Sequence, residues 1–149
     1  MTAPGGEIWF YHLERSRVED VLPELLERTL KRGWRAVVRH ADVEVLARLD
    51  AHLWSYRDDS FLPHALASEP FAAEQPILLG GGDAPANGAQ ALFVLDASDG
   101  PVEGYERCVI LFDDDEARAR ARELWRSHKA GGRPVTYWRQ ADKGWTKVA

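Results

Sequence analysis

Apolar residues along the chain fall into two patterns, short aliphatic or aromatic runs and longer stretches with helical spacing. Six short runs predict strands, and they are Glu7–Tyr11, Arg35–Val38, Pro76–Leu79, Ala91–Leu95, Cys108–Phe112 and Val135–Trp138. Between Val18 and Leu30, and again between Val45 and Leu53, apolar positions recur every three or four residues. This spacing predicts two helices. The order of strands and helices predicts parallel strands covered by helices.

Polar residues mark where these first two helices begin. Ser16 and Glu19 have the spacing of a capping box, which predicts the start of the first helix. Pro23 predicts a kink in that helix unless the helix starts nearer Asp20. Asp42 is expected to cap the second helix.

A third helix is expected after the strand at Cys108–Phe112. The acidic run Asp113–Asp115 supplies a cap and negative charge at its start, and Gly131 and Gly132 end it. At about 100° per residue, one face, which we expect to pack closely on the sheet, consists of Ala117, Ala121, Leu124 and His128. A second face, which we call the basic stripe, consists of Arg118, Arg122, Trp125 and Lys129. This stripe is either an ordinary solvated face or a binding surface, and Arg120 is expected on the far side of the helix.

These elements predict a single α/β domain over residues 1–149, in which helices cover both faces of a mostly parallel sheet. A length of 149 residues with 45% hydrophobic residues is enough for one domain with its own core. The pattern lapses between Ser55 and Gln75, which predicts a loop longer than most.

Charge and cysteine content narrow the classes of function. A net charge of −5 argues against a general binder of polyanions. From Arg107 onward, however, the chain has ten Lys/Arg residues and six Asp/Glu residues. The net charge of this region is therefore positive, which suits an acidic partner. The single cysteine, Cys108, excludes an internal disulfide, which fits a reducing compartment, and its place in a strand predicts a core residue. No apolar run is long enough for a membrane span, and we expect a cytoplasmic protein.

Motifs for catalysis or cofactor binding are weak. Gly80–Gly82 follows a strand, as a phosphate-binding loop would, but no lysine followed by serine or threonine comes after it. A nucleotide-binding enzyme that uses this loop is the alternative function. The five histidines lack metal-ligand spacing. We therefore expect no catalytic residues, no metal and no cofactor. Direct binding of single-stranded nucleic acid by arginines and indoles is a third hypothesis, and the acidic remainder of the chain argues against it as a primary role.

Four separated stretches resemble one known family. They are IWFYHL, LLERTLKRGWRAVV, ARLDAHLWSYRDDSFLPHALA and FDDDEARARARELWRSHKAGGRPVTYW. Over nearly its whole length the chain resembles the chi subunit of bacterial DNA polymerase III holoenzyme. This resemblance implies a three-layer α/β domain that is similar to nucleotide-binding folds but has no nucleotide site. It also implies a subunit without catalytic activity of its own.

The resemblance further implies partners. The chi subunit joins the clamp-loader side of the replicase to single-stranded-DNA-binding protein (SSB) by binding the acidic SSB tail, which ends in proline-phenylalanine. The residues of the family's tail site fall on Arg118, Arg122 and Trp125, and Lys129 completes the basic stripe. The phenylalanine that contacts the psi subunit falls on Phe61. The segment Phe61, Leu62 and Pro63 is therefore expected to bind psi or another replisome or helicase-like protein, and DNA is expected to be contacted only indirectly.

Overall fold

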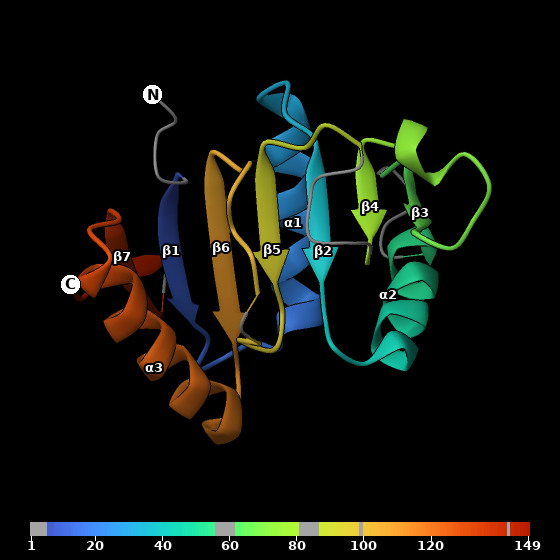
Figure 1. Ribbon diagram of the computed structural model, residues 1–149. Coiled ribbons are helices and arrows are strands. Elements are labelled where there is room, and N and C mark those ends of the chain that lie inside the picture. The colour runs from blue at the N-terminus through green and yellow to red at the C-terminus, as the bar shows by residue number, and fades with distance from the viewer. Residues whose placement is uncertain (1–5, 56–61, 81–86, 99, 143) are drawn as a thin grey trace.

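The computed structural model describes residues 6–55, 62–80, 87–98, 100–142 and 144–149. Within these ranges one sheet is flanked by three α-helices (Figure 1). The strands are β1 (Glu7–His12), β2 (Ala36–Arg39), β3 (His64–Leu66), β4 (Ile77–Leu79), β5 (Ala91–Val94), β6 (Arg107–Phe112), β7 (Val135–Gln140) and β8 (Trp145–Lys147). The helices are α1 (Val18–Lys31), α2 (Val43–Ser55) and α3 (Asp115–Ala130).

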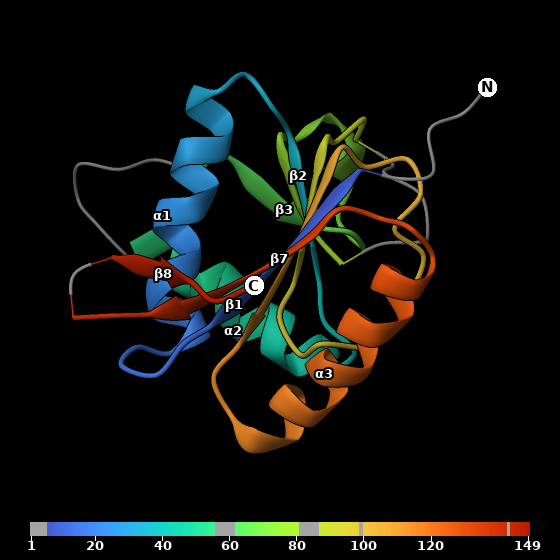
Figure 2. The same ribbon diagram turned by 90° about the vertical axis from the view of Figure 1, so that its left-hand side faces the viewer.

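The sheet has the strand order β3-β4-β2-β5-β6-β1-β7-β8. All neighbouring strands are parallel except β7 and β8. Helix α1 lies on one side of the sheet and α3 on the other (Figure 2). Leucines of α2 pack in the same core cluster as those of α1. The predicted α/β fold with a mostly parallel sheet between helices is therefore confirmed.

Helix α3 forms as its sequence predicts. Its first turn is capped by Asp114, whose Oδ1 accepts a hydrogen bond from the N–H of Ala117 at 2.7 Å. The small residues Ala117 and Ala121 are buried against the sheet together with Leu124. Because two of these three side chains are single methyl groups, the helix lies close to β6, β1 and β7 and leaves the basic stripe at the surface.

The start of α1 differs from the prediction. The capping box predicted at Ser16 and Glu19 is wrong, because the helix begins at Val18 and its N-cap residue is Arg17, whose N–H donates to the Asp20 carboxylate at 3.2 Å. Asp113, which follows β6, accepts a hydrogen bond from the N–H of Val18 at 2.8 Å. The Ser16 hydroxyl instead accepts one from the side-chain amide of Gln140 at 2.9 Å.

Helix α2 compensates for a proline within α1. Pro23 has no N–H, so the carbonyl of Glu19 loses the partner it would have in a regular helix. The Nε2 atom of His52 in α2 lies 2.9 Å from that carbonyl and donates to it. This bond satisfies the free carbonyl and joins the two helices on their shared side of the sheet.

Two short strands and a short helix were not predicted. Strand β3 and the 3-10 helix Ala72–Glu74 lie within the stretch expected to be a loop, and β8 lies in the C-terminal segment. Each has three residues, which is too few to give a periodic pattern. Strand β8 extends the sheet by pairing with β7, with Trp138 opposite Lys147.

The side chain of Cys108 is buried in the core cluster on the α3 side of the sheet, as predicted. Burial raises the pKa of its thiol to about 12, so the thiol stays protonated at neutral pH. In the part of the chain that the structure describes, no helix is long and apolar enough to cross a membrane.

Candidate functional site

A pocket of about 340 Å³ lies between α3 and the adjoining strands β1 and β7. We call it the α3 pocket, and it is lined by His12, Arg118, Arg122, Trp125, Tyr137, Arg139, Val148 and Ala149. Three of the four residues of the basic stripe therefore line one cavity. Its opposite wall forms because β1 and β7 are parallel neighbours whose register places His12 beside Arg139.

The floor of the α3 pocket is aromatic and held from the core. The half-buried indole of Trp125 meets Phe10 at 5.5 Å and Tyr137 at 6.0 Å between ring centroids, both in edge-to-face geometry. The imidazole of His12 stacks on Phe112 at 5.1 Å. These contacts fix the rings before a ligand arrives, so binding costs little side-chain entropy.

The rim of the α3 pocket carries positive charge that the protein does not neutralise. Arg118, Arg122 and Arg139 are exposed, and among the described residues none of the three forms an ion pair with a carboxylate. Elsewhere on α3, by contrast, Arg126 pairs with Glu123 at 2.7 Å. Arginines that lack acidic partners beside an apolar floor suit a ligand with both a carboxylate and an aromatic group.

Lys129, the fourth residue of the basic stripe, is not part of the pocket lining. Its ammonium lies 5.6 Å from the centroid of the Trp125 ring, which is within cation–π distance. Lys129 therefore contacts the indole of the pocket floor and does not contribute to the lining itself.

His12 adds little positive charge to the α3 pocket. Burial lowers its pKa, and the neighbouring cations Arg118 and Arg139 lower it further against the opposing effect of Glu14. Its Nδ1 lies 3.2 Å from the hydroxyl of Tyr137, a phenol whose pKa is itself raised by burial. At neutral pH the imidazole is thus neutral and can accept a hydrogen bond from the tyrosine hydroxyl, and the charge of the pocket comes from its arginines.

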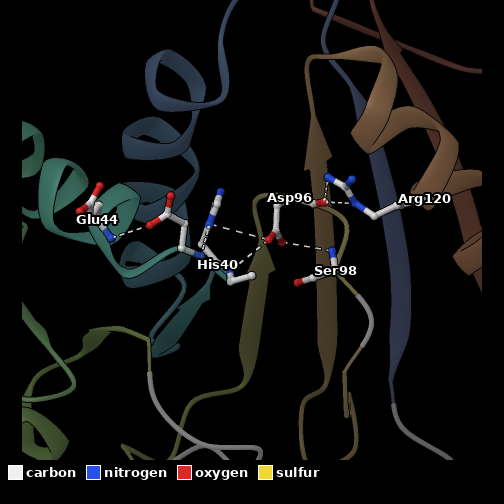
Figure 3. A network of polar contacts seen from close by, with 7 residues as sticks. His40, Glu44, Asp96, Ser98 and Arg120 are labelled. Carbon is white, nitrogen blue, oxygen red and sulfur yellow. Dashed lines mark hydrogen bonds and ion pairs between the residues drawn. The ribbon is translucent and has the colours of Figure 1, made fainter.

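A second and larger pocket, of about 580 Å³, lies where β2, β5 and β6 end. We call it the carboxyl-end pocket, and its lining includes His40, Arg48, Asp96, Asp113, Asp114 and Arg120. Arg120 donates from Nε and Nη2 to the backbone carbonyl of Asp96, at 3.0 and 2.8 Å (Figure 3). Arg120 thus lies on the far side of α3 from the basic stripe, as predicted.

The carboxylates of the carboxyl-end pocket are engaged by the protein itself. Asp96 accepts hydrogen bonds from the N–H groups of Ala41 at 3.0 Å and Ser98 at 3.1 Å, and His40 approaches it to 3.7 Å (Figure 3). Burial alone would raise the pKa of Asp96, but the hydrogen bonds from Ser98 and Ala41 outweigh it and lower the pKa. Asp113 and Asp114 cap α1 and α3, as described above.

This arrangement gives the nucleotide-binding alternative no support. Helix N-termini at the carboxyl ends of parallel strands are where α/β folds bind phosphate, and here Asp113 and Asp114 occupy two of them. Of the proposed glycine loop, Gly80 is described, whereas residues 81 and 82 lie outside the described residues. Residues 87–90 lead into β5 and not into a helix that could hold a phosphate.

The described residues contain no group of three or more histidine, cysteine, aspartate or glutamate side chains placed to hold a metal ion. Of the segment expected to bind psi, Phe61 lies outside the described residues. Leu62 packs into the core with 3% of its surface exposed, and Pro63 is half-buried.

Five of the lining residues are not predicted by the sequence pattern, namely His12, Tyr137, Arg139, Val148 and Ala149. The predicted strand ends at Trp138, and Arg139 lies just beyond it. Alternation along a strand would have placed Tyr137 and Arg139 on one face. Nothing in the sequence alone shows that this face meets α3.

Comparisons with known proteins agree on one family. A protein-family model described as "DNA polymerase III chi subunit, HolC" matches residues 6–136. A protein of Pseudomonas aeruginosa named "DNA polymerase III subunit chi" is 34% identical over 113 residues, which cover 74% of this chain and 78% of that protein. A protein of Rickettsia prowazekii named "Probable DNA polymerase III subunit chi" is 26% identical over 89 residues, covering 60% of this chain and 54% of that protein.

Proposed function

Because this chain belongs to the DNA polymerase III chi subunit family, we propose that it is a non-catalytic adaptor that links the clamp-loader assembly of the replicase to SSB. In this proposal the α3 pocket binds the acidic C-terminal tail of SSB. The observation that carries the proposal is the set of three arginines, without carboxylate partners among the described residues, around an aromatic floor.

The chemistry of such a tail matches the two parts of the α3 pocket. Arg118 and Arg122 lie one helical turn apart on α3, and Arg139 faces them from β7. Acidic side chains and the terminal carboxylate of the tail can bind these guanidinium groups through charge-assisted hydrogen bonds. The terminal phenylalanine ring would pack against Trp125, whose orientation is set by its contacts with the core.

The test is fluorescence anisotropy with a labelled acidic peptide that ends in proline-phenylalanine. A site of this size should bind with micromolar affinity, about −8 kcal/mol. Arg122→Ala removes hydrogen bonds to a charged group, which is worth about 1.5–3 kcal/mol and should weaken binding at least tenfold. Amidating the terminal carboxylate of the peptide should also weaken binding.

Arg126→Ala is the matched control. Arg126 is exposed on the same helix, is absent from the pocket lining and already pairs with Glu123. Arg120 is a poorer control, because its bonds to Asp96 join α3 to the segment after β5. Equal losses of affinity for Arg126→Ala and Arg122→Ala would show that diffuse charge binds the peptide, and the pocket proposal would be wrong.

The proposal keeps the segment Phe61, Leu62 and Pro63 as the contact for a psi subunit or a helicase-like partner. The buried side chain of Leu62 would anchor the segment, and the ring of Phe61 would make the contact. Phe61→Ala should then abolish capture of purified psi while the melting temperature stays unchanged. Retained capture, or a large loss of stability, would remove this part of the proposal.

The proposal also includes the absence of catalysis. The aspartates of the carboxyl-end pocket, which could otherwise serve an acid–base reaction, accept hydrogen bonds from the backbone. Purified protein should show no polymerase, nuclease or nucleotidase turnover. Turnover that co-purifies with the chain and disappears in Asp96→Ala would contradict this assignment.

A further inference from the structure

The face of the sheet opposite the α3 pocket carries most of the tryptophans. Side chains alternate along β1 and β7, so His12 and Tyr137 point toward α3 whereas Trp9 and Trp138 point toward α1. The rings of Trp9 and Trp138 are 6.3 Å apart between centroids. The indole N–H of Trp138 donates to the Thr136 hydroxyl at 3.0 Å, which fixes this half-buried ring.

Arginines alternate with these rings. The guanidinium of Arg107 lies 3.9 Å from the centroid of Trp9 and 5.2 Å from that of Trp34. The guanidinium of Arg32 lies 4.1 Å from the centroid of Trp34. The result is a row of Arg32, Trp34, Arg107, Trp9 and Trp138, which we call the indole face. Much of it lines a groove of about 160 Å³ between α1 and the sheet.

The charge of the indole face is positive. Arg28 lines the same groove, and Lys147 lies opposite Trp138 in the sheet. Arg28 pairs with Glu24 at 2.8 Å, and Arg107 pairs with Glu7 at 2.6 Å. Arg32 and Lys147 are exposed, and neither has an ion-pair partner among the described residues. The four cations of this surface thus have only two carboxylate partners among the described residues, which leaves it with a net positive charge beside the indole rings.

We propose that the indole face binds single-stranded DNA. Sheet surfaces that bind single strands stack bases on aromatic side chains, and arginines and lysines beside those rings hold the phosphates. A guanidinium that stacks on an indole keeps its in-plane N–H groups available for phosphate oxygens. Trp138 lies at the end of the row away from the arginines and would stack a base, while Arg32 and Lys147 would bind phosphates.

This inference goes beyond the proposed function, in which DNA is contacted only indirectly. The two sites occupy opposite faces of β1 and β7, so they share no lining residue. The protein could thus hold the SSB tail and a stretch of single-stranded DNA at once. The two activities should be separable by mutation.

The test is a titration of the full chain with a fluorescein-labelled oligothymidylate at low salt, followed by anisotropy and by quenching of tryptophan fluorescence. Two or three phosphate contacts predict a slope of log K against log salt of about −1.5 to −2. Arg32→Glu should weaken oligonucleotide binding by about tenfold or more, because it replaces a phosphate contact with repulsion. Trp138→Leu should weaken it by about fivefold or more through lost stacking.

Arg126→Glu is the control for charge, since Arg126 is exposed on the other side of the sheet. It should leave oligonucleotide affinity unchanged. Arg122→Ala should lose the tail peptide but keep the oligonucleotide, and Arg32→Glu should do the reverse. This pair of variants separates failure of the indole face from failure of the α3 pocket.

Three results would overturn the proposal. The first is no quenching or anisotropy change at low salt with wild-type protein. The second is an equal loss of oligonucleotide affinity in Arg32→Glu and Arg126→Glu, which would mean diffuse charge. The third is competition by a polyglutamate peptide that matches competition by unlabelled oligothymidylate, which would mark the face as a site for acidic protein segments.

Discussion

The two pockets on either side of α3 differ in how they use their charged groups. The carboxyl-end pocket is the larger and holds more ionisable residues, yet its aspartates cap helices or accept backbone hydrogen bonds. The α3 pocket is smaller, and its three arginines have no carboxylate partners among the described residues. In the function proposed above, the smaller cavity is the binding site, because its arginines lack carboxylate partners among the described residues, whereas the aspartates of the larger cavity already accept hydrogen bonds from the protein.

A related difference concerns the loop after β1. In nucleotide-binding α/β folds this loop binds phosphate through backbone N–H groups. Here the side-chain oxygen of Gln140 accepts hydrogen bonds from three successive N–H groups, those of Glu14, Arg15 and Ser16, at 3.2, 2.8 and 3.1 Å. The loop thus binds a neutral amide of its own chain. Together with the helix-capping aspartates, this amide occupies backbone N–H groups that bind phosphate in nucleotide-binding folds.

The largest expected effect lies in the carboxyl-end pocket. Asp96→Ala leaves the N–H groups of Ala41 and Ser98 without their acceptor, so the free energy of unfolding should fall by about 2–4 kcal/mol. Urea unfolding measures this change. Affinity for the tail peptide should remain the same in buffer where the variant is folded. If peptide binding fell while stability stayed constant, the roles assigned to the two pockets would have to be exchanged.

An intermediate effect is expected from Arg139→Ala in the α3 pocket. Loss of this guanidinium should weaken peptide binding by about tenfold, for the reason given for Arg122. The free energy of unfolding should change by less than about 0.5 kcal/mol, because Arg139 is exposed and has no ion-pair partner among the described residues. Arg15→Ala, which breaks an exposed pair with Asp142, is a control from the same end of the sheet. Unchanged peptide affinity in Arg139→Ala would restrict the site to α3.

The smallest effect concerns the pH dependence of peptide binding. The pKa of His12 lies below its ordinary value of 6.5, chiefly through burial and then through Arg118 and Arg139, while Glu14 and Asp115 oppose this shift. An anionic ligand beside His12 should raise that pKa again. Binding then takes up protons, so affinity should increase as the pH falls below 6.5. The increase should stay below tenfold if the pKa rises by less than about one unit.

His12→Gln should abolish this increase and leave affinity at neutral pH nearly unchanged. The same pKa has an opposite consequence for the free protein. The unfolded protein binds a proton at His12 more readily than the folded protein does, because the folded pKa is the lower of the two. The stability that this residue contributes is therefore present above pH 6.5 and is lost as the pH falls toward the folded pKa. A flat pH profile of peptide binding in wild-type protein would place the ligand away from His12.

The features that the sequence could predict are local ones. Helix α3 has its cap, its glycine end and its small inward face within one continuous stretch, so its position and the placement of Arg118, Arg122 and Trp125 followed from spacing. One contact at the start of α1 could not be predicted in this way, because the acceptor for the N–H of Val18 comes from a residue 95 positions later. The second wall of the α3 pocket depends on the pairing of β1 with β7, and the hydroxyl of Tyr137 reaches the imidazole of His12 across 125 positions.

The position of β1 in the sheet has a consequence for how the protein comes to be folded. Both neighbours of β1, the strands β6 and β7, lie in the last third of the chain. During synthesis the first strand therefore emerges from the ribosome long before any strand with which it pairs. Contacts between residues so far apart in the sequence are slow to form, and unpaired strands are prone to aggregation in the meantime. The strand that carries Trp9 on one face and His12 on the other can pair only after β6 and β7 have been synthesised, so neither proposed binding surface can be complete before then.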